Sequence, residues 1–357
     1  MKIAIVAGGT GGHVYPALTL AEELQNRGDE ILFIGSSTRM EKDLVPERGF
    51  KYIGLDVDIF SGNVLNKLKS LFTINKAKRK CMSILKGYDM AVGFGNYISV
   101  PVLLAAKKLG LKTVIHEQNS FAGKANRMLD RKVNLVIGSY PENKKQFRNR
   151  HTLILGNPQS SKAMAVEKDP KLIKKFGLDP KKKTVVIFMG SLGSQTINKV
   201  VLDYFKLTDG SYQIIYATGK QNYENVLKNV DEKDYIKCFE TIDGANVMKN
   251  STLLVCRAGA TTLAEITAMG MPAILIPSPY VPNNHQYYNA KSLSDRDAAI
   301  LIEEKDLTPD KLNKEISDII NNESKLKSLG NHALALGNPK VLEDMVLAIE
   351  KLWLMNS

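Results

Sequence analysis

The sequence contains few cysteines and no long run of apolar residues. Only three of its 357 residues are cysteines, and the spacing of Cys81, Cys238 and Cys256 fits neither a disulfide framework nor a zinc site. No apolar run approaches the roughly 18 residues that a membrane-spanning helix needs. The first residues also lack the apolar core of a signal peptide. We therefore expect a protein of the reducing cytoplasm, with neither a secretion signal nor a membrane span.

Aromatic residues are scarce, and acidic residues are scarce in the first half of the chain. Aromatics make up 7% of the sequence, which offers little on which bases could stack, and no recognised nucleic-acid-binding module is present. Residues 1–157 carry 24 Lys and Arg against 13 Asp and Glu, whereas residues 158–357 carry 25 against 24. This asymmetry indicates an anionic partner for the first half. We expect a membrane surface and no nucleic acid.

One basic stretch, residues 63–86, has no acidic residue at all. It has a helical pattern in which apolar residues alternate with basic ones, namely Lys67, Lys69, Lys76, Lys78, Arg79, Lys80 and Lys86. Basic amphipathic helices without acids are typical of surfaces that lie against anionic lipid. A domain helix with solvated lysines on its outer face is an equally good interpretation.

The chain begins with an apolar, β-branched run that leads into a glycine-rich turn. Residues 8–13 read Gly-Gly-Thr-Gly-Gly-His, and a helical pattern begins at Pro16. Glycines before a helix N-terminus let a ligand approach the backbone, and they direct free N–H groups at an anion such as a diphosphate. The spacing matches neither the dinucleotide fingerprint nor a Walker loop. His13 is a candidate proton acceptor, although plain α/β architecture explains such a turn more often than catalysis does.

Strand-like and helix-like segments alternate along the whole chain. Strands are predicted at residues 3–7, 30–35, 51–55, 89–95, 112–115, 133–139, 152–155, 184–189, 213–218, 235–241, 253–256 and 273–276. This alternation predicts an α/β protein with parallel sheets covered on both faces. Because Gly156-Asn157-Pro158 breaks the pattern, we expect two Rossmann-like domains, 1–157 and 158–340, whose sheets face a central cleft. The amphipathic last helix, within residues 341–357, is expected to pack back on the first domain.

The second half contains further candidates for binding an anionic ligand. A second glycine-rich turn lies at residues 190–194, and Arg257, which precedes a third helix start, could neutralise a phosphate. Glu265 lies in the first turn of the helix predicted from Leu263. Its carboxylate could accept hydrogen bonds from ribose hydroxyls, or it could simply favour the helix dipole.

No metal or cofactor is expected. Asp56-Val57-Asp58 matches a D-x-D pattern for nucleotide sugars, but the pattern is short and common, and nothing else in the chain resembles a magnesium site. The five histidines do not form a metal-binding trio by spacing.

Four motifs occur in order along nearly the whole chain: Gly-Gly-Thr-Gly-Gly-His-Val-Tyr-Pro-Ala at 8–17, His-Glu-Gln-Asn-Ser at 116–120, Arg-Ala-Gly-Ala-Thr-Thr-Leu-Ala-Glu at 257–265, and Pro-Ser-Pro-Tyr through Gln at 277–286. Together they resemble the MurG family of peptidoglycan glycosyltransferases, which add N-acetylglucosamine to lipid I. The resemblance implies a GT-B fold and inverting transfer from UDP-GlcNAc to the C4 hydroxyl of the muramoyl sugar. The product would be the β-1,4-linked lipid II. It also implies a peripheral protein on the cytoplasmic face of the plasma membrane.

The resemblance assigns roles to individual residues. His13 is the first candidate for the general base, and Glu117 is the second. Ile242 would hold the uracil through its backbone, Glu265 the ribose and Gln286 the sugar. The full set expected to contact substrate is Thr10, Gly11, Gly12, Asn119, Ser191, Ile242, Arg257, Ala260, Thr261, Thr262, Leu263, Ala264, Glu265 and Gln286.

The chain departs from the family pattern in three places. Leu192 stands where the family has Gln or Arg in its second glycine-rich turn. Gln159-Ser160-Ser161 stands where an arginine is usual, and Asn96 replaces the second glycine of Gly-Gly-Tyr. These changes bear on donor affinity and not on the fold. Two alternatives stay open: a degenerate donor-binding scaffold of the cell-wall machinery, and a UDP-sugar 2-epimerase, for which the basic stretch has no use.

Overall fold

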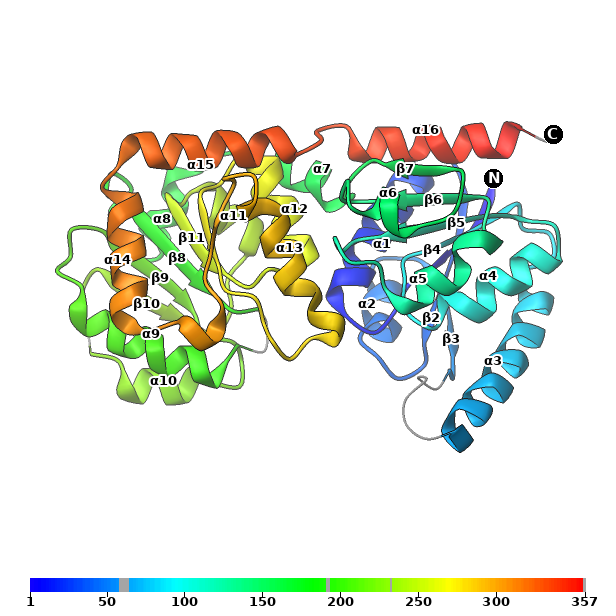
Figure 1. The fold of residues 1–357 in the computed structure, drawn as a ribbon, viewed down its shortest axis with the longest axis horizontal. Coiled ribbons are helices and arrows are strands. Elements are labelled where there is room, and N and C mark those ends of the chain that lie inside the picture. Colours follow the sequence, from blue (N-terminus) through cyan, green and yellow to red (C-terminus); the bar gives the residue numbers. More distant parts are fainter. Residues whose placement is uncertain (58–63, 191–192, 232, 356–357) are drawn as a thin grey trace. The chain divides into compact units, whose positions relative to one another are not determined.

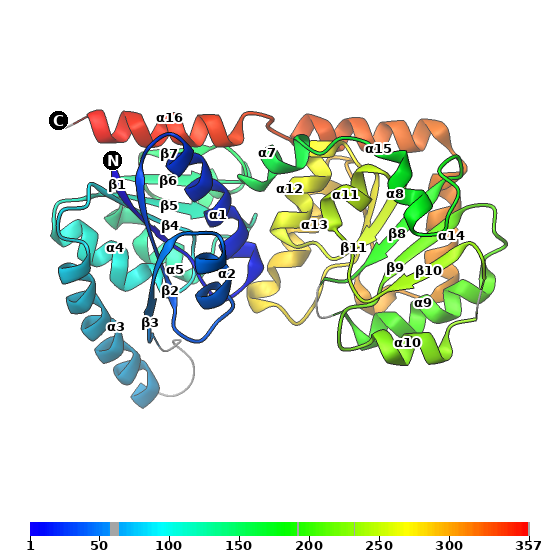
Figure 2. The ribbon, with the colours of Figure 1, turned by 180° about the vertical axis from the view of Figure 1, so that it is seen from behind.

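The computed structural model describes residues 1–57, 64–190, 193–231 and 233–355. The chain forms two compact units, drawn in Figures 1 and 2. Unit 1 comprises Met1–Ser161 and Lys340–Ser357, and unit 2 comprises Lys162–Pro339. The first crossing between the units therefore follows Ser161, whereas the sequence places the boundary after Asn157.

Unit 1 is built on a seven-stranded sheet in the order β3-β2-β1-β4-β5-β6-β7, and every neighbouring pair is parallel. Its strands are β1 (Lys2–Val6), β2 (Glu30–Ser36), β3 (Lys51–Leu55), β4 (Met90–Gly93), β5 (Lys112–Glu117), β6 (Leu135–Gly138) and β7 (Thr152–Ile154). The order reverses between β1 and β4, and open α/β sheets bind ligands at the carboxyl ends of their strands at such a point.

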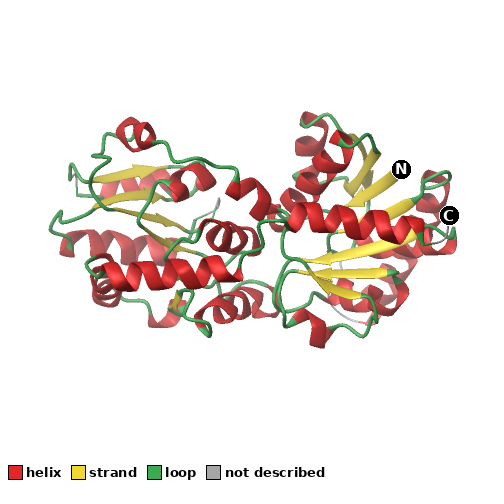
Figure 3. Cartoon of the chain, turned by 90° about the horizontal axis from the view of Figure 1, so that it is seen from above, coloured by secondary structure: helices red, strands yellow, loops and turns green. Residues whose placement is uncertain are grey.

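Helices cover both faces of this sheet, as Figure 3 shows. They are α1 (Gly11–Asn26), α2 (Glu41–Glu47), α3 (Val64–Ile84), α4 (Ser99–Lys108), α5 (Lys124–Leu129), the 3-10 helix η1 (Asp130–Lys132), α6 (Asn143–Gln146), α7 (Gln159–Met164, which runs into unit 2) and α16 (Val341–Leu354). Leu18 of α1 and Met345 of α16 are buried in one core, and Ile74 of α3 and Leu103 of α4 are buried in the other. The two cores flank the sheet, so the last helix of the chain completes the core of unit 1.

Unit 2 is built on a six-stranded parallel sheet in the order β10-β9-β8-β11-β12-β13. Its strands are β8 (Thr184–Phe188), β9 (Gln213–Ala217), β10 (Ile236–Phe239), β11 (Leu253–Cys256), β12 (Ala273–Leu275) and β13 (Ile300–Leu301). Its helices are α8 (Pro170–Lys175), α9 (Gln195–Leu207), α10 (Tyr223–Asn229), α11 (Gly244–Lys249), α12 (Ala260–Met269), η2 (Pro282–Asn284), α13 (His285–Ser294), η3 (Glu304–Asp306), α14 (Pro309–Ile320) and α15 (Glu323–Leu336). The predicted α/β class, with two Rossmann-like domains, is confirmed.

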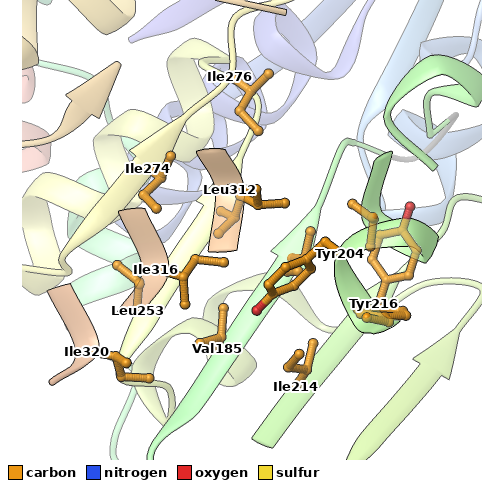
Figure 4. Close-up of a cluster of buried hydrophobic side chains, with 14 of the residues drawn as sticks. Val185, Tyr204, Ile214, Tyr216, Leu253, Ile274, Ile276, Leu312, Ile316 and Ile320 are labelled. Carbon is orange, nitrogen blue, oxygen red and sulfur yellow. The ribbon is translucent and has the colours of Figure 1, made fainter. Parts of the chain in front are cut away.

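The core of unit 2 shows why α14 lies against the sheet. Leu312, Ile316 and Ile320 recur at helical spacing, and Figure 4 shows them gathered with Val185 and Ile214 from the central strands. All five side chains are almost fully buried. Each contributes about 1.5–3 kcal/mol relative to an exposed side chain, so packing of this kind holds α14 against the sheet.

Among the described residues, no helix combines the length and the apolar character needed to cross a membrane.

Candidate functional site

The glycine-rich turn of unit 1 connects the carboxyl end of β1 to α1. The helix begins at Gly11, with Thr10 in extended conformation as its N-cap, so the prediction that it begins at Pro16 is wrong. Pro16 lies in the second turn, where its ring nitrogen cannot donate to the carbonyl group four residues before it. The flexible glycines allow the helix to start earlier than the proline signal suggests. The backbone N–H groups of Gly11 and Gly12 therefore lie in the first turn, which is where helices bind anions.

His13 lies in this first turn and is held from two sides. Its Nδ1 is 3.0 Å from the Thr10 hydroxyl oxygen. A Cβ atom on Gly95 would lie 3.2 Å from His13 Nε2, and Gly95 itself has a φ of +73°. When the Thr10 oxygen accepts the Nδ1 proton, Nε2 carries the lone pair. This arrangement allows the imidazole to act as a base through Nε2.

Glu117, the second candidate base, is the last residue of β5 and is only 2% exposed. One carboxylate oxygen accepts hydrogen bonds from the Asn119 backbone and side chain at 3.0 and 3.3 Å. The other accepts from Gly123 N–H and Asn126 Nδ2 at 2.8 and 2.9 Å. Burial raises its pKa, and these four hydrogen bonds act in the opposite direction. Because both of its oxygens already accept hydrogen bonds, this carboxylate is better suited to holding the 119–126 loop, including Asn119, than to proton transfer.

His116 precedes Glu117 and is completely buried within the strand. Its Nε2 donates to the Gly156 carbonyl oxygen at 2.9 Å, and burial lowers its pKa to about 4. A neutral imidazole is therefore expected at physiological pH. The sequence predicts that residues 116–120 all follow the strand, but β5 continues through Glu117 because two more backbone pairs form with β6.

A pocket of about 510 Å³ opens in unit 2 beside the second glycine-rich turn. It brings together Arg257 and Gln286 from the predicted set, and its described lining is Met189, Gly190, Gly193, Ser194, Gln195, Thr196, Arg257, Ser278, Tyr280 and Gln286. Gln286 Oε1 accepts a hydrogen bond from Ser278 N–H at 2.9 Å. The amide is therefore oriented so that Nε2, a donor, remains for other contacts.

Arg257 is held by groups of the protein itself. Its guanidinium pairs with the Glu304 carboxylate at 2.6 Å, donates to the Ile276 carbonyl oxygen at 3.1 Å and donates to the Ser194 hydroxyl at 3.2 Å. Both charged side chains are about nine-tenths buried, with exposed fractions of 11% and 7%. The arginine therefore joins three segments around the pocket, and its contact with a phosphate stays a prediction.

Glu265 lies in the second turn of α12, because the helix begins at Ala260 and not at Leu263. The residues that precede Leu263 are compatible with a helix, and Gly259 supplies the extended N-cap position. The dipole interpretation weakens accordingly, since that effect fades beyond the first turn. Burial, with repulsion from Asp243, raises the pKa of Glu265 to about 7. Asp243 directly follows Ile242, so two residues predicted to hold the nucleoside lie near each other.

The start of α12 supplies another polar atom without a partner. The Thr261 hydroxyl oxygen is buried and has no hydrogen-bond partner in the described part of the protein. Thr262 and Ala264 lie on the same helix, in its first two turns. Ile242 and residues 260–265 do not line the 510 Å³ pocket, so the described donor-site residues fall in two groups.

Ser191, Leu192 and Asp58 lie outside the described residues. Asp56, the other half of the D-x-D pattern, accepts a hydrogen bond from the Ser37 hydroxyl. Within the described ranges, no group of three or more His, Cys, Asp or Glu side chains is placed to hold a metal ion.

Glu41 and Asn96 contact the first glycine-rich turn, and the sequence predicts this contact for neither residue. Glu41 is completely buried at the start of α2, a short helix that the sequence analysis does not predict. Asn96 adopts a φ of +62°, and Asn enters this left-handed region more readily than other non-glycine residues. This property explains how Asn can replace the glycine that the family has at this position, and it is the one feature of the sequence that could have drawn attention to Asn96.

Comparison with known proteins agrees with this geometry. The glycosyltransferase family 28 N-terminal domain matches residues 3–137, and the family's C-terminal domain matches residues 184–345. The chain is 39% identical to a UDP-N-acetylglucosamine–N-acetylmuramyl-(pentapeptide) pyrophosphoryl-undecaprenol N-acetylglucosamine transferase of Bacillus pumilus, over 95% of this chain and 96% of that protein. It is 37% identical to the transferase of the same name from Bacillus subtilis, over 99% of each.

Solved structures support the same assignment. The crystal structure of Acinetobacter baumannii MurG matches with a TM-score of 0.82 and 28% identity, over 98% of this chain and 99% of that one. A UDP-N-acetylglucosamine 2-epimerase from Listeria monocytogenes, described as putative in its title, shares the fold with a TM-score of 0.69 but only 15% identity. By sequence along nearly its whole length, this chain belongs to the UDP-N-acetylglucosamine–N-acetylmuramyl-(pentapeptide) pyrophosphoryl-undecaprenol N-acetylglucosamine transferases of glycosyltransferase family 28.

Proposed function

We propose that this chain transfers N-acetylglucosamine from UDP-GlcNAc to the C4 hydroxyl of the muramoyl sugar of lipid I, forming a β-1,4 linkage with inversion. The observation that carries the proposal is the sequence identity of 39% and 37%, over 95% and 99% of this chain, to two transferases named for transfer of N-acetylglucosamine to this acceptor. Two local features support it: the imidazole of His13 at a helix start in unit 1, and the partly buried carboxyl group of Glu265, which has no hydrogen-bond partner in the described part of unit 2.

In this proposal His13 is the general base. Its Nε2 takes the proton of the acceptor C4 hydroxyl as that oxygen attacks the anomeric carbon, and the bond to UDP breaks on the opposite side. General bases of this kind contribute about 10²- to 10⁴-fold to the rate. In this proposal the Thr10 hydroxyl oxygen, 3.0 Å from Nδ1, accepts the Nδ1 proton and stabilises the imidazolium that forms.

Unit 2 binds the donor in this proposal. Ionised Glu265 accepts hydrogen bonds from the ribose hydroxyls, and the Thr261 hydroxyl gains the partner that it lacks in the described structure. The Ile242 backbone receives the uracil. The N-terminus of α9, which lines the pocket at Gln195 and Thr196, faces the diphosphate and stabilises its charge as it departs.

We also propose that α3 attaches the protein to the cytoplasmic face of the plasma membrane. Phe72 is 71% exposed on this helix. The neighbouring basic residues Lys76, Arg79 and Lys80 are exposed as well, and no acidic residue is present in 64–84 to oppose them. Each basic group near an anionic bilayer is worth about 1 kcal/mol. A lipid-linked acceptor explains why a surface of this character would be retained.

Analysis of the product tests the reaction directly. Incubation with UDP-GlcNAc and a short-chain lipid I analogue should give a disaccharide whose NMR coupling at the new anomeric position is that of a β-linkage. The epimerase alternative predicts a change of the UDP-sugar without acceptor. The scaffold alternative predicts UDP-GlcNAc binding and no product. Either of those results would overturn the proposal.

A further inference from the structure

Both polar atoms of the peptide group between Gly8 and Gly9 are held by hydrogen bonds to the side chains of Glu41 and Asn96. We call these hydrogen bonds the grip. The Gly9 N–H donates to both oxygens of the Glu41 carboxylate at 3.2 Å. The Gly8 carbonyl oxygen accepts a hydrogen bond from Asn96 Nδ2 at 2.6 Å. Because N–H and C=O of one peptide lie in one plane, these two side chains together fix the orientation of that plane.

Both gripping side chains are themselves anchored. Glu41 Oε1 also accepts from Ser36 N–H at 2.9 Å, so the carboxylate links the ends of the neighbouring strands β1 and β2. Asn96 Oδ1 accepts from Tyr97 N–H at 2.5 Å, which orients its amide so that the NH₂ group faces Gly8. The grip therefore rests on three strand ends and not on flexible surface groups.

The glycines of this region make room for the grip. A Cβ atom on Gly8 would overlap Glu41 Oε1, and one on Gly35 would lie 2.6 Å from the Tyr52 hydroxyl oxygen and 2.7 Å from Glu41 Cγ. A Cβ atom on Gly9 would lie 2.5 Å from Asn96 Nδ2, and Gly9 has a φ of +91°. A larger residue at any of the three positions would therefore require Glu41, Asn96 or Tyr52 to shift.

Glu41 is an unusual residue for a purely structural role. Its side chain is completely buried, and among the described residues no lysine or arginine forms an ion pair with it. Burying a carboxylate is costly unless hydrogen bonds replace its hydration, and the replacements here are the N–H groups of the turn and of β2. An apolar side chain would fill the same space at lower cost but could not orient the Gly9 peptide.

We propose that Glu41 and Asn96 are positioning residues for the transfer reaction, which act by fixing the Gly8–Gly9 peptide. This peptide is followed directly by Thr10, whose hydroxyl contacts His13, so rotation of its plane would displace the base and its partner together. The inference rests on the proposed function of His13. A misplacement of about 1 Å at a reacting group can cost about 10²-fold in rate.

The test uses Glu41→Gln, Asn96→Asp and the matched control Asp130→Asn in the full-length protein. Gln and Asp are nearly isosteric replacements that turn one bond of the grip from attraction into repulsion. Asp130 is a suitable control because it is 5% exposed in the same unit and accepts from Arg148 and Asn149 N–H at 2.8 Å, in a different loop. Its replacement disturbs the same kind of bond without touching the glycine-rich turn.

Two readouts are needed. The first is amide hydrogen exchange of residues 8–13, which does not depend on activity and is expected to accelerate at least tenfold in Glu41→Gln and Asn96→Asp but not in Asp130→Asn. The second is steady-state kinetics at a temperature where all variants are folded. We expect kcat to fall about 10- to 100-fold in the two grip variants, with KM for UDP-GlcNAc within about twofold of wild type.

The outcomes distinguish failure of the positioning role of Glu41 and Asn96 from failure of the proposed transferase function. If exchange accelerates while kcat stays equal to that of Asp130→Asn, the grip exists but does not position the reaction, and the inference is overturned. Unchanged exchange in both grip variants would refute the grip itself. Absence of transfer by the wild-type protein would instead count against the proposed function. If Glu41→Gln fails to fold, Asn96→Asp can still be measured, because Asp also tolerates the left-handed backbone conformation of position 96.

Discussion

Three carboxyl groups, those of Glu41, Glu117 and Glu265, differ in the hydrogen bonds that they accept. Glu117 accepts four, and Glu41 accepts from the two backbone N–H groups of Gly9 and Ser36. Glu265 accepts none from the described residues, and its pKa is correspondingly raised to about 7. Hydrogen-bond donors must come from elsewhere to stabilise its charged form, and the hydroxyls of a nucleoside are such donors.

Replacement of Glu265 by Gln should stabilise the ligand-free protein at alkaline pH. Because the folded-state pKa of about 7 is above the ordinary value of 4.5, the folded protein holds this proton more tightly. The wild type therefore loses stability as pH rises from about 4.5 through 7. We expect the Gln variant to be more stable by about 1–3 kcal/mol at pH 8 and equal to wild type at pH 4.5. Urea unfolding at the two pH values measures this; a variant less stable at pH 8 would contradict it.

The affinity of the wild type for UDP should rise with pH, whereas the stability of the ligand-free protein falls. The ionised carboxylate is the better hydrogen-bond acceptor, so we expect wild-type affinity to fall as pH drops from 8 to 6. Calorimetric titration of Glu265→Gln should show weaker binding at pH 8 and little dependence on pH. Equal affinity of the two proteins at pH 8 would remove Glu265 from the donor site.

Replacement of His13 by Ala should depress turnover much more than donor binding. Loss of a general base costs about 10²- to 10⁴-fold in kcat, whereas in the proposed function UDP is held by residues of unit 2. Single-turnover kinetics and UDP titration of the same preparation separate the two effects. The companion variant Glu117→Gln tests the second candidate. A larger loss of kcat there than in His13→Ala would exchange their roles.

At the scale of elements, the sequence predicts the sheets well and the short helices poorly. The strand at Leu253–Cys256 has the predicted bounds, and the last helix, Val341–Leu354, lies within the predicted residues 341–357, because short buried apolar runs and amphipathic spacing are strong signals. Helix starts are less accurate. Gly11 and Ala260 begin helices three or more residues before the predicted points, because Thr10 and Gly259 take up the extended N-cap conformation just before them.

The same limit applies to the site. The sequence points to His13 and Glu265 because they occur in recognisable motifs. It does not reveal that Arg257 is paired with Glu304, 47 positions further on in the sequence, at 2.6 Å. Long-range pairs of this kind depend on tertiary packing, and so does the grip of Glu41 on Gly9. Neither leaves a local pattern of propensity or spacing.

The basic residues of α3 should control binding to anionic vesicles. Changing Lys76, Lys78, Arg79 and Lys80 to Gln should weaken binding at least tenfold, and the lost affinity should be salt-sensitive. The matched control changes four basic residues of unit 2, Lys171, Lys174, Lys175 and Lys181, to Gln. Sedimentation with vesicles that contain anionic lipid measures both. Equal loss in the two variants would show an effect of net charge and not of α3.

At the scale of the whole molecule, unit 1 is built from two stretches of the chain that are separated in sequence by unit 2. Unit 1 takes its last core helix, α16, from the C-terminal end of the chain, after all of unit 2 has been completed. Met345 and Ile349 of that helix are completely buried against the sheet of unit 1. Folding of unit 1 therefore cannot be finished until the entire chain is available.

A core change in α16 should consequently destabilise unit 1. Met345→Ala removes a fully buried side chain, at an expected cost of about 2–5 kcal/mol. Leu347→Ala on the same helix is the control, since Leu347 is 42% exposed and a surface change is worth about 0.5 kcal/mol or less. Urea unfolding followed by hydrogen exchange of β1 would show the effect. Protection of β1 that is unaffected by Met345→Ala would contradict this role of α16.

The measurement that tests the central claim most directly is transfer of radiolabelled N-acetylglucosamine from its UDP donor to a short-chain lipid I analogue, with UDP release followed in parallel. The proposed reaction predicts label on the acceptor together with an equal amount of UDP, and neither without acceptor. UDP-GlcNAc binding without transfer to a verified acceptor would contradict it, and would favour a donor-binding scaffold in which the departures at Leu192 and Gln159 have removed activity.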